Sequence, residues 1–190
     1  MEIKSLDNTN FDELFEAFRM AFADYEVQLD KTELQTMLKR RGFNPGLSFA
    51  AFDADRIVSF TCNGIGNYYG TPTAYDSGTG TLKEYRGKGL ATQVFEYSIP
   101  YLKEAGIQEY LLEVLQHNTG AVSVYRKIGF GVTRNFCYFR PDIEQINKDT
   151  TVLDFPYRLQ PIDINVFRSI PDFWDFKPSW QNSFESINRT

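Results

Sequence analysis

Histidine and cysteine are scarce in this chain, which argues against a metal centre and against a serine-hydrolase triad. Its 190 residues include 1 histidine and 2 cysteines. A zinc site draws on several such residues, usually at short spacing, whereas Cys62 and Cys137 lie far apart in the sequence. A Ser-His-Asp triad would have to use His117, and the G-x-S-x-G elbow that carries such a serine is missing. We therefore expect His117 to be an ordinary loop residue and both cysteines to be reduced, buried hydrophobic residues in strands.

Long apolar runs and basic stripes are also missing. No apolar run approaches the about 20 residues that cross a membrane, and the N-terminus lacks the apolar region of a signal peptide. The formal net charge is −5, and the basic triplet 39–41 is expected to complement a helix dipole at the C-terminal end of a helix. These features predict a cytoplasmic protein without a nucleic-acid or membrane partner.

The composition is that of a folded domain. Hydrophobic residues make up 42% of the chain and aromatic residues 16%, which is enough for a full core in one domain or slightly more. Apolar periodicity predicts strands over residues 2–5, 47–52, 57–62, 74–82, 111–115, 130–139 and 152–160. It predicts helices over residues 11–22, 31–41, 89–105 and 118–128.

The stretch Arg86-Gly-Lys-Gly-Leu-Ala91 is the most informative in the chain. It lies between a predicted strand and a predicted helix, and a glycine-rich turn in that position binds anions. The backbone N–H groups at a helix start have no partners within the helix and point outward. Gly87 and Gly89 lack the Cβ atoms that would block a phosphate, and Arg86 and Lys88 add positive charge. The turn therefore predicts a site for a phosphorylated small molecule.

Two common phosphate-binding motifs do not fit this turn. A Walker loop requires G-x-x-x-x-G-K-[ST], whereas Lys88 is followed by Gly89. A dinucleotide fingerprint requires G-x-G-x-x-G, whereas Thr92 stands where the third small residue belongs. The pattern Arg-x-x-Gly-x-Ala at residues 86–91 instead resembles the pyrophosphate-binding signature of the GCN5-related N-acetyltransferases, Gln/Arg-x-x-Gly-x-Gly/Ala.

A second segment resembles the same family. Residues 111–115 read as a buried strand, Asn118 is a suitable N-cap for the next helix, and Gly129 stands where a helix commonly ends. The run Asn118-x-x-Ala-x-x-x-Tyr125-x-x-x-Gly129-Phe is similar to the second conserved segment of the family, at the expected distance from the first. The resemblance covers about residues 2–160.

This resemblance implies an α/β fold with a mixed twisted central sheet flanked by helices, the acyl-CoA N-acyltransferase fold. It implies acetyl-CoA as the cosubstrate and Tyr125 as the acid that protonates the leaving thiolate. A strand N–H between residues 79 and 82 would polarise the thioester carbonyl. The residues that the resemblance places against the cofactor are Gly80, Thr81, Leu82, Arg86, Gly87, Lys88, Gly89, Leu90, Ala91, Asn118 and Tyr125.

The general base is less well defined by the sequence. An amine with a pKa of about 10.4 is neutral only about once in 10³ molecules at pH 7, so a carboxylate that removes its proton is useful. Asp76 and Tyr75 lie on the strand that leads to the phosphate turn, near where some relatives carry a catalytic glutamate, and Asp76 is the first choice. Glu113 and Glu26 are alternatives, whereas Glu84 is expected to be exposed.

The acceptor side is implied to be built by residues 23–45 and 63–72, of which the second reads as a flexible aromatic loop. The tyrosines of this side either line a pocket or are surface-loop aromatics. They are Tyr25, Tyr68, Tyr69 and Tyr75. The acceptor is left as the primary amine of a small molecule or a peptide.

Residues 161–190 form an aromatic-rich extension of the acyltransferase domain predicted over residues 1–160. One interpretation is that this extension packs back on its own domain. The other is that it opens a second, related half, whose aromatic surface that half or a homodimer would cover. Two functions accordingly stand: a soluble N-acetyltransferase that transfers the acetyl group directly in a ternary complex, and a non-catalytic acyl-CoA-binding module of a tandem protein.

Overall fold

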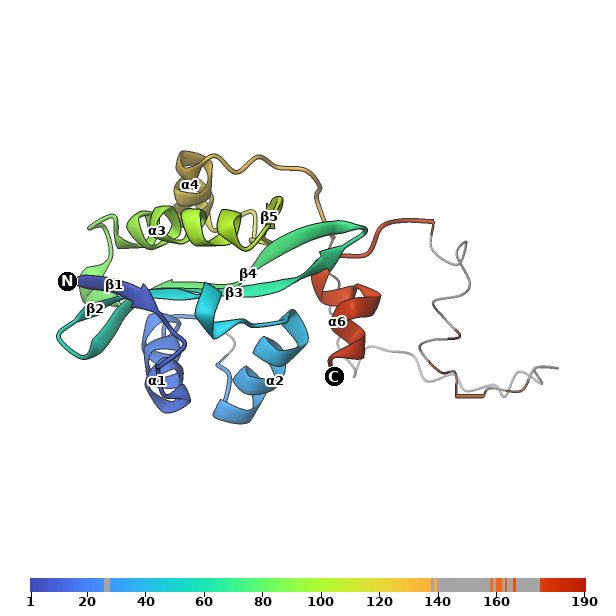
Figure 1. The fold of residues 1–190 in the computed structure, drawn as a ribbon, viewed down its shortest axis with the longest axis horizontal. Coiled ribbons are helices and arrows are strands. Elements are labelled where there is room, and N and C mark those ends of the chain that lie inside the picture. The colour runs from blue at the N-terminus through green and yellow to red at the C-terminus, as the bar shows by residue number, and fades with distance from the viewer. Residues whose placement is uncertain are drawn as a thin grey trace.

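A mixed five-stranded sheet forms the centre of the molecule (Figure 1). The computed structural model describes residues 1–25, 28–137, 139, 158, 160, 161, 163, 166 and 175–190. The strands, in their order across the sheet, are β1 (Glu2–Ser5), β2 (Phe49–Asp53), β3 (Arg56–Tyr68), β4 (Thr71–Thr81) and β5 (Glu109–Leu111). The first four pair antiparallel, and β5 pairs with β4 in parallel. This mixed sheet confirms the predicted fold class.

Helices cover both faces of the sheet (Figure 1). One face carries α3 (Leu90–Glu104) and α4 (Thr119–Ile128), and the other carries α1 (Phe11–Ala21), α2 (Lys31–Arg41) and the short α6 (Phe184–Asn188). The Asn10 side chain caps α1 as predicted, by accepting a hydrogen bond from the Asp12 amide. Among the described residues, no helix combines the length and the apolar character that crossing a bilayer requires.

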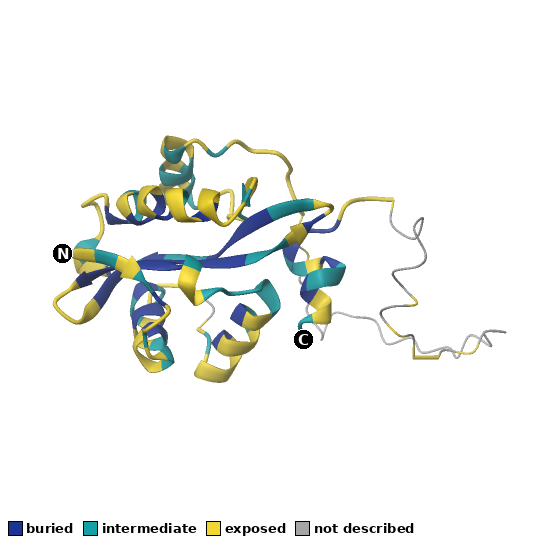
Figure 2. Cartoon of the chain, in the orientation of Figure 1, coloured by how far each residue is buried: buried dark blue, intermediate teal, exposed yellow. Residues whose placement is uncertain are grey.

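The core lies between the sheet and the two helical layers (Figure 2). Both β2 and β3 are buried over most of their length, because helices cover both of their faces. On one face, the ring of Phe18 in α1 lies 5.3 Å from that of Phe60 in β3. On the other, Phe95 of α3 lies 5.8 Å from Tyr125 of α4. Burial of each such side chain contributes about 1.5–3 kcal/mol, so these contacts hold α1 and α4 in place.

The β3–β4 hairpin extends further than predicted. Strand β3 continues through residues 63–68, and the chain turns at Tyr69 and Gly70, whose φ angles of 53° and 91° are left-handed. The prediction of a flexible loop over residues 63–72 is therefore wrong, because glycine in this strand permits close packing. A Cβ atom at Gly64 would lie only 2.0 Å from the Arg41 carbonyl oxygen.

Two predicted strands are shorter than expected or do not form. Strand β5 ends at Leu111, so residues 112–115 lie outside the ladder, and residues 130–137 form no strand. A strand needs a hydrogen-bonding partner along its length, and β5 is too short to offer one to residues 130–137. Val132 in this segment is accordingly 70% exposed.

The two cysteines differ in their surroundings. Cys62 in β3 is buried, as predicted, whereas Cys137 is exposed and the prediction for it is wrong. Cys137 follows the segment that fails to pair with the sheet, and this leaves its side chain in solvent. The strand predicted over residues 152–160 and the aromatic residues 173 and 174 fall almost wholly outside the described residues.

Gly64→Ala is expected to destabilise the fold, because its methyl group would overlap the carbonyl group of Arg41 at the end of α2. Overpacking of this kind costs about 1–3 kcal/mol of unfolding free energy. Gly120→Ala in α4 is the matched control, since a Cβ atom there would meet only the Asn118 side chain at 3.9 Å. The control is expected to be neutral or to gain up to about 1 kcal/mol. Urea unfolding measures both, and equal stability of the two variants would contradict the packing.

Candidate active site

The predicted phosphate turn connects β4 to α3 and presents backbone N–H groups to open space. Gly87 and Gly89 have φ angles of 76° and 75°, in the left-handed region that glycine adopts without strain. A Cβ atom at Gly87 would meet no atom within 4 Å, and one at Gly89 only the Gln93 side chain at 3.8 Å. Among the described residues, none accepts a hydrogen bond from the amides of residues 87–92. The start of α3 therefore fits an anion such as a diphosphate.

The two basic side chains of the turn are placed differently. The Arg86 guanidinium donates to Asp24 Oδ2 at 3.1 Å, to the Ala21 carbonyl at 2.8 Å and to the Thr81 carbonyl at 3.2 Å. Lys88 Nζ lies 4.6 Å from the centre of the Tyr85 ring within the turn itself. Arg86 thus links the turn to the end of α1 and forms an ion pair with Asp24. Lys88, in contrast, lies within the turn whose amides lack acceptors.

The end of β4 leads rigidly into this turn. Thr81 Oγ1 lies 2.8 Å from Ser59 Oγ, and the amide of the buried Leu82 donates to the Val58 carbonyl at 3.0 Å. Gly80 is required by core packing, since a Cβ atom there would lie 2.7 Å from the Phe60 ring. Because the Leu82 amide is engaged, the predicted carbonyl-polarising N–H has to come from residues 79–81.

Strands β4 and β5 separate close to the turn. Their parallel ladder ends at the pair Tyr75–Leu111, and β4 then continues without β5 beside it. The pairing of β4 with β3 shifts at this point, which leaves Ser77 as the extra residue of a β-bulge. We refer to the region between residues 76–81 of β4 and residues 112–115 as the β4/β5 divergence. The edge of β4 that faces it has no neighbouring strand in the described part of the chain.

The two predicted catalytic residues are in direct contact at the β4/β5 divergence. The Tyr125 hydroxyl of α4 donates a hydrogen bond to Asp76 Oδ2 at 2.9 Å. The Thr79 hydroxyl donates to the same oxygen at 2.9 Å, and the Gly78 amide donates to Oδ1 at 2.9 Å. Asp76 is only 8% exposed. Its buried carboxyl group therefore depends on these three donors for its hydrogen bonds. Spacing along the sequence does not reveal this contact, because it joins a strand to a distant helix.

Burial changes the proton affinity of this pair. It raises the pKa of Asp76 above the ordinary value, although the hydrogen bonds from Tyr125, Thr79 and Gly78 oppose the rise. Burial and the neighbouring Asp76 charge raise the pKa of Tyr125 as well. Both side chains therefore hold a proton more tightly than they would in water. A hydrogen-bonded pair of this kind is suited to taking up a proton and passing it on.

Asn118 caps α4 as predicted and also reaches the other helical layer. Its Oδ1 accepts a hydrogen bond from the Ala121 amide at 3.2 Å, and its Nδ2 donates to the Tyr25 hydroxyl at 2.9 Å. Tyr25 lies between α1 and α2, so this contact links the start of α4 to the α1–α2 connection. Glu26, one of the alternative bases, lies outside the described residues.

A second polar cluster, which the sequence did not reveal, lies at the same divergence on the face of α2 and α6. Gln181 Nε2 donates to the Tyr75 hydroxyl at 3.0 Å and to Glu113 Oε2 at 3.1 Å. Gln181 Oε1 accepts a hydrogen bond from Arg41 at 2.9 Å. Desolvation of the carboxyl group raises the pKa of Glu113, although the residue as a whole is exposed and the Gln181 hydrogen bond acts in the opposite direction. No motif marks Gln181, and only the fold brings it here.

The other predicted candidates lie outside these clusters or in the core. Glu84 is exposed and pairs with Arg56 at 3.1 Å, as expected for a surface residue. Of the tyrosines assigned to the acceptor side, Tyr68 and Tyr75 are buried, whereas Tyr69 is 53% exposed. The buried pair is therefore part of the packed structure beneath the acceptor side.

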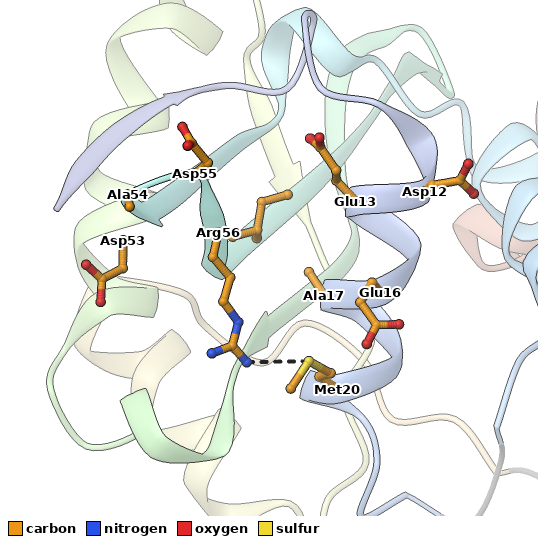
Figure 3. A pocket seen from close by; sticks show the side chains of 10 residues that line it. Asp12, Glu13, Glu16, Ala17, Met20, Asp53, Ala54, Asp55 and Arg56 are labelled. Carbon is orange, nitrogen blue, oxygen red and sulfur yellow. Dashed lines mark hydrogen bonds between the residues drawn. The ribbon is translucent and has the colours of Figure 1, made fainter.

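An acidic groove between α1 and the β2–β3 turn contains none of the predicted site residues (Figure 3). Its carboxylates come from Asp12, Glu13, Glu16, Asp53 and Asp55. They would repel a diphosphate, and the Arg56 guanidinium there is 3.5 Å from Met20 Sδ. In the described ranges, no cluster of histidine, cysteine and acidic side chains is arranged to hold a metal ion. The phosphate turn remains the better place for an anionic cofactor.

Comparison with known proteins agrees with this geometry. Residues 10–130 match the model of the acetyltransferase (GNAT) family. The chain belongs to this family, and the resemblance seen in its two motifs is confirmed.

Individual relatives cover different parts of the chain. It is 36% identical over 87 residues to N-alpha-acetyltransferase 30 of Schizosaccharomyces pombe, a match that covers 45% of this chain and 58% of that protein. Its fold is similar to that of an aminoglycoside acetyltransferase from an uncultured soil metagenomic sample, with a TM-score of 0.60, 18% identity and coverage of 75% and 95% of the two chains. A chain of the NatC complex bound to Gag peptide and CoA gives a TM-score of 0.58 at 21% identity, with coverage of 70% and 87%. The chain thus spans about half the length of the curated relatives it matches.

The unfolding free energy of the protein is expected to fall, relative to that of Asp76→Asn, as the pH rises above about 4. Burial raises the pKa of Asp76 in the folded state, so the folded state keeps this proton after the unfolded state has released it. As the pH rises from the unfolded-state pKa of Asp76 through its folded-state pKa, the unfolding free energy therefore falls, by about 1.4 kcal/mol for each unit by which the two pKa values differ. Urea unfolding of both proteins across the acidic and neutral range measures the effect. Parallel pH dependence of the two proteins would show that Asp76 is not perturbed.

Proposed function

We propose that the chain is an acetyl-CoA-dependent N-acetyltransferase that acetylates a primary amine of a small molecule or peptide by direct attack in a ternary complex. The observation that carries this proposal is the hydrogen bond between Tyr125 and Asp76 at the β4/β5 divergence. It joins an acid and a base candidate, and the same strand leads into a helix start whose amides have no acceptor among the described residues. Membership of the acetyltransferase family supports the same activity.

The residues of the phosphate turn fit the diphosphate of coenzyme A. The amides of residues 87–92 have no acceptor among the described residues, the side of Gly87 where a Cβ atom would lie is open, and Lys88 adds a positive charge to the turn. The cofactor supplies an activated acetyl thioester when it is bound. Residues 79–81 of β4 lie between the turn and Asp76 in the sequence, and this supports the assignment of the carbonyl-polarising N–H to this stretch.

Asp76 and Tyr125 together move one proton from nitrogen to sulfur. Asp76 accepts the proton of the attacking amine, which its raised pKa favours. Tyr125 gives its own proton to the leaving sulfur and recovers one from Asp76 along their 2.9 Å hydrogen bond. The nitrogen–carbon bond forms and the carbon–sulfur bond breaks, so atoms and charge balance without another reactant.

A peptide N-terminus is the acceptor that we favour. The similar protein of Schizosaccharomyces pombe is named an N-alpha-acetyltransferase, and the similar NatC complex is bound to a peptide. An α-amino group has a pKa of about 7.7–8.0, so a substantial fraction of it is neutral at pH 7. A buried carboxylate such as Asp76 is then a sufficient base for the remaining proton.

Tyr125→Phe is expected to lower kcat at least about 100-fold, because it removes the hydroxyl that protonates the leaving sulfur. The KM for acetyl-CoA should stay within about twofold, since the phosphate turn is untouched. Free-thiol release with a panel of amines measures both constants. The panel contains a short peptide with a free N-terminus, spermidine and an aminoglycoside.

Tyr101→Phe is the control for that experiment. This tyrosine is 42% exposed on α3, its hydroxyl lies 3.1 Å from that of Tyr97, and its removal should leave kcat unchanged. Full activity of Tyr125→Phe would remove the residue from the mechanism. Thermal stabilisation of the wild-type chain by acetyl-CoA without thiol release for any amine would favour the non-catalytic binding module instead.

Gly87→Asp is expected to raise the KM for acetyl-CoA at least about tenfold over Gly87→Asn, because it places a carboxylate among the amides that bind the diphosphate. The two substitutions have the same size, and both residues tolerate a left-handed φ such as the 76° of Gly87. They differ only in charge, so their thermal unfolding midpoints should agree. Equal KM values for the two variants would mean that the diphosphate binds elsewhere.

A further inference from the structure

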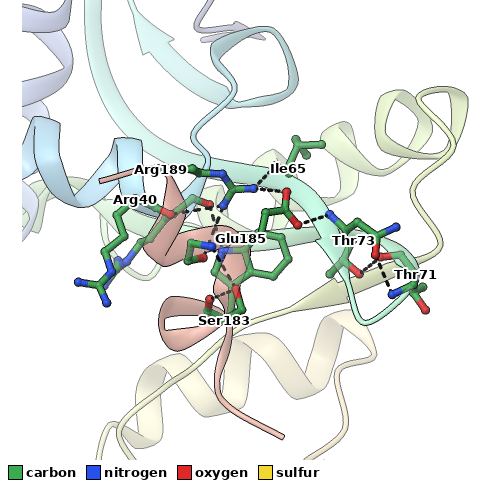
Figure 4. Close-up of polar contacts among 12 residues, drawn as sticks. Arg40, Ile65, Thr71, Thr73, Ser183, Glu185 and Arg189 are labelled. Carbon is green, nitrogen blue, oxygen red and sulfur yellow. Dashed lines mark hydrogen bonds and ion pairs between the residues drawn. The ribbon is translucent and has the colours of Figure 1, made fainter. Parts of the chain in front are cut away.

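The C-terminal segment, residues 178–190, is held against the domain by several polar contacts (Figure 4). The Arg189 guanidinium donates to the Ile65 carbonyl at 3.2 Å and pairs with Glu185 at 2.6 Å. Glu185 also accepts a hydrogen bond from the Asn67 amide at 2.9 Å. The segment is therefore attached to the far end of β3, beside the β4/β5 divergence.

Two side chains of this segment reach the divergence itself. Trp180 is 3% exposed, and its ring lies parallel to that of Tyr75 at 5.3 Å with an interplanar angle of 2°. Its indole N–H donates to the Arg41 carbonyl at 3.0 Å. This anchor places the next residue, Gln181, above the point where β4 and β5 separate.

Gln181 connects the two sides of the divergence. On the side of β4, it donates to the Tyr75 hydroxyl and accepts from Arg41, which in turn donates to the Ser77 carbonyl at 2.6 Å in the β-bulge. On the side of residues 112–115, the same amide nitrogen donates to Glu113 at 3.1 Å. One side chain therefore sets the spacing between Tyr75 and Glu113.

This cluster lies on the face of the sheet opposite the phosphate turn and Tyr125 (Figure 1). The phosphate turn, α3 and α4 with Tyr125 lie on one face of the sheet (Figure 1). Asp76 contacts Tyr125 on that face, whereas its neighbour Tyr75 contacts the C-terminal segment on the other. If the proposed cofactor occupies the first face, the second face is left for the amine, and Glu113 is exposed there.

We propose that residues 178–190 form one wall of the acceptor site, and that Gln181 is a positioning residue that links Glu113, where the cationic amine enters, to the buried Tyr75 beneath it. This inference rests on the proposed transferase function and assigns part of its substrate site to a segment outside the residues that match the family. The carboxylate of Glu113 attracts the ammonium group of the acceptor, which releases one proton to solvent, and Asp76 takes the second proton as the neutral amine attacks.

The groups that face Glu113 come from each element packed against it. They are the Gln181 side chain and the Trp180 amide of the C-terminal segment, Arg41 of α2, Arg134 of the segment after α4, and Tyr75 of β4. The Arg41 guanidinium is engaged by Ser77 and Gln181. The Arg134 guanidinium donates to the Tyr68 hydroxyl at 2.8 Å and to the Lys177 carbonyl. Both cations are therefore held by protein acceptors. Glu113 is exposed as a residue, although its carboxyl group is partly desolvated and accepts the Gln181 hydrogen bond.

The test compares Gln181→Ala and Gln181→Glu in the full chain, using the peptide, spermidine and aminoglycoside panel and thiol release. Both variants should lower kcat/KM for the acceptor about tenfold and leave the KM for acetyl-CoA unchanged. The Gln181 hydrogen bond favours the ionised carboxylate, so its loss raises the pKa of Glu113. In the pH profile of kcat/KM for the acceptor, the acidic limb should therefore move to higher pH in both variants. The shift should be larger in Gln181→Glu than in Gln181→Ala, because the new carboxylate adds a second negative charge beside Glu113.

Asn182→Ala is the matched control, because it removes an amide from the same segment whose nearest polar partner is Arg40 at 3.5 Å. This control should behave as the wild type. Unchanged acceptor kcat/KM and pH profile in both Gln181 variants would overturn the inference while the transferase function stands. A parallel loss of kcat/KM for the acceptor and for acetyl-CoA, together with a lower unfolding midpoint, would also overturn the inference, because it would show that Gln181 has a purely structural role. If the wild-type chain released no thiol with any amine of the panel, that result would refute the proposed function itself.

Discussion

The end of the β4–β5 ladder at Tyr75 and Leu111 is the constraint on which the site depends. Up to this pair the two strands satisfy each other's backbone groups, and beyond it the edge of β4 has no partner strand in the described chain. Unpaired buried backbone groups are costly, so a separation of this kind is unusual in a sheet. Both polar clusters, that of Asp76 and Tyr125 and that of Gln181, lie at its margin.

Buried charge is kept at this margin for a chemical reason. Among the described residues, Asp76 is the only buried acidic side chain, and its carboxyl group is held by three donors. Burial makes its charged form unfavourable, which costs stability, and the same effect raises its proton affinity, as the proposed role of a base requires. The contact with Tyr125 joins it to the proposed acid, so in the proposed mechanism stability and reactivity depend on the same hydrogen bond.

Local features of the sequence were sufficient for most of the fold up to residue 128. Helix ends are set by contacts within a few residues, so they can be predicted without a structure. Examples are the side-chain caps Asn10 and Asn118 and the terminal glycines Gly42 and Gly129. Loops and sheet edges were harder to predict. Gly64 and Gly66 of β3 looked like loop residues because the neighbours that require them lie on other elements: Arg41 beside Gly64, and Arg189 and Glu185 beside Gly66.

The phosphate turn and the candidate acid were determined by the sequence alone, because both depend on spacing along one strand–turn–helix unit or one helix. The contact between Asp76 and Tyr125, the engagement of Arg86 by Asp24, and the approach of Gln181 to Glu113 were decided only by the tertiary structure. Each joins residues from different elements, and their distance is set by how helices and strands pack. Side-chain periodicity identifies the face that a residue occupies, but it carries no information on which distant residue lies opposite.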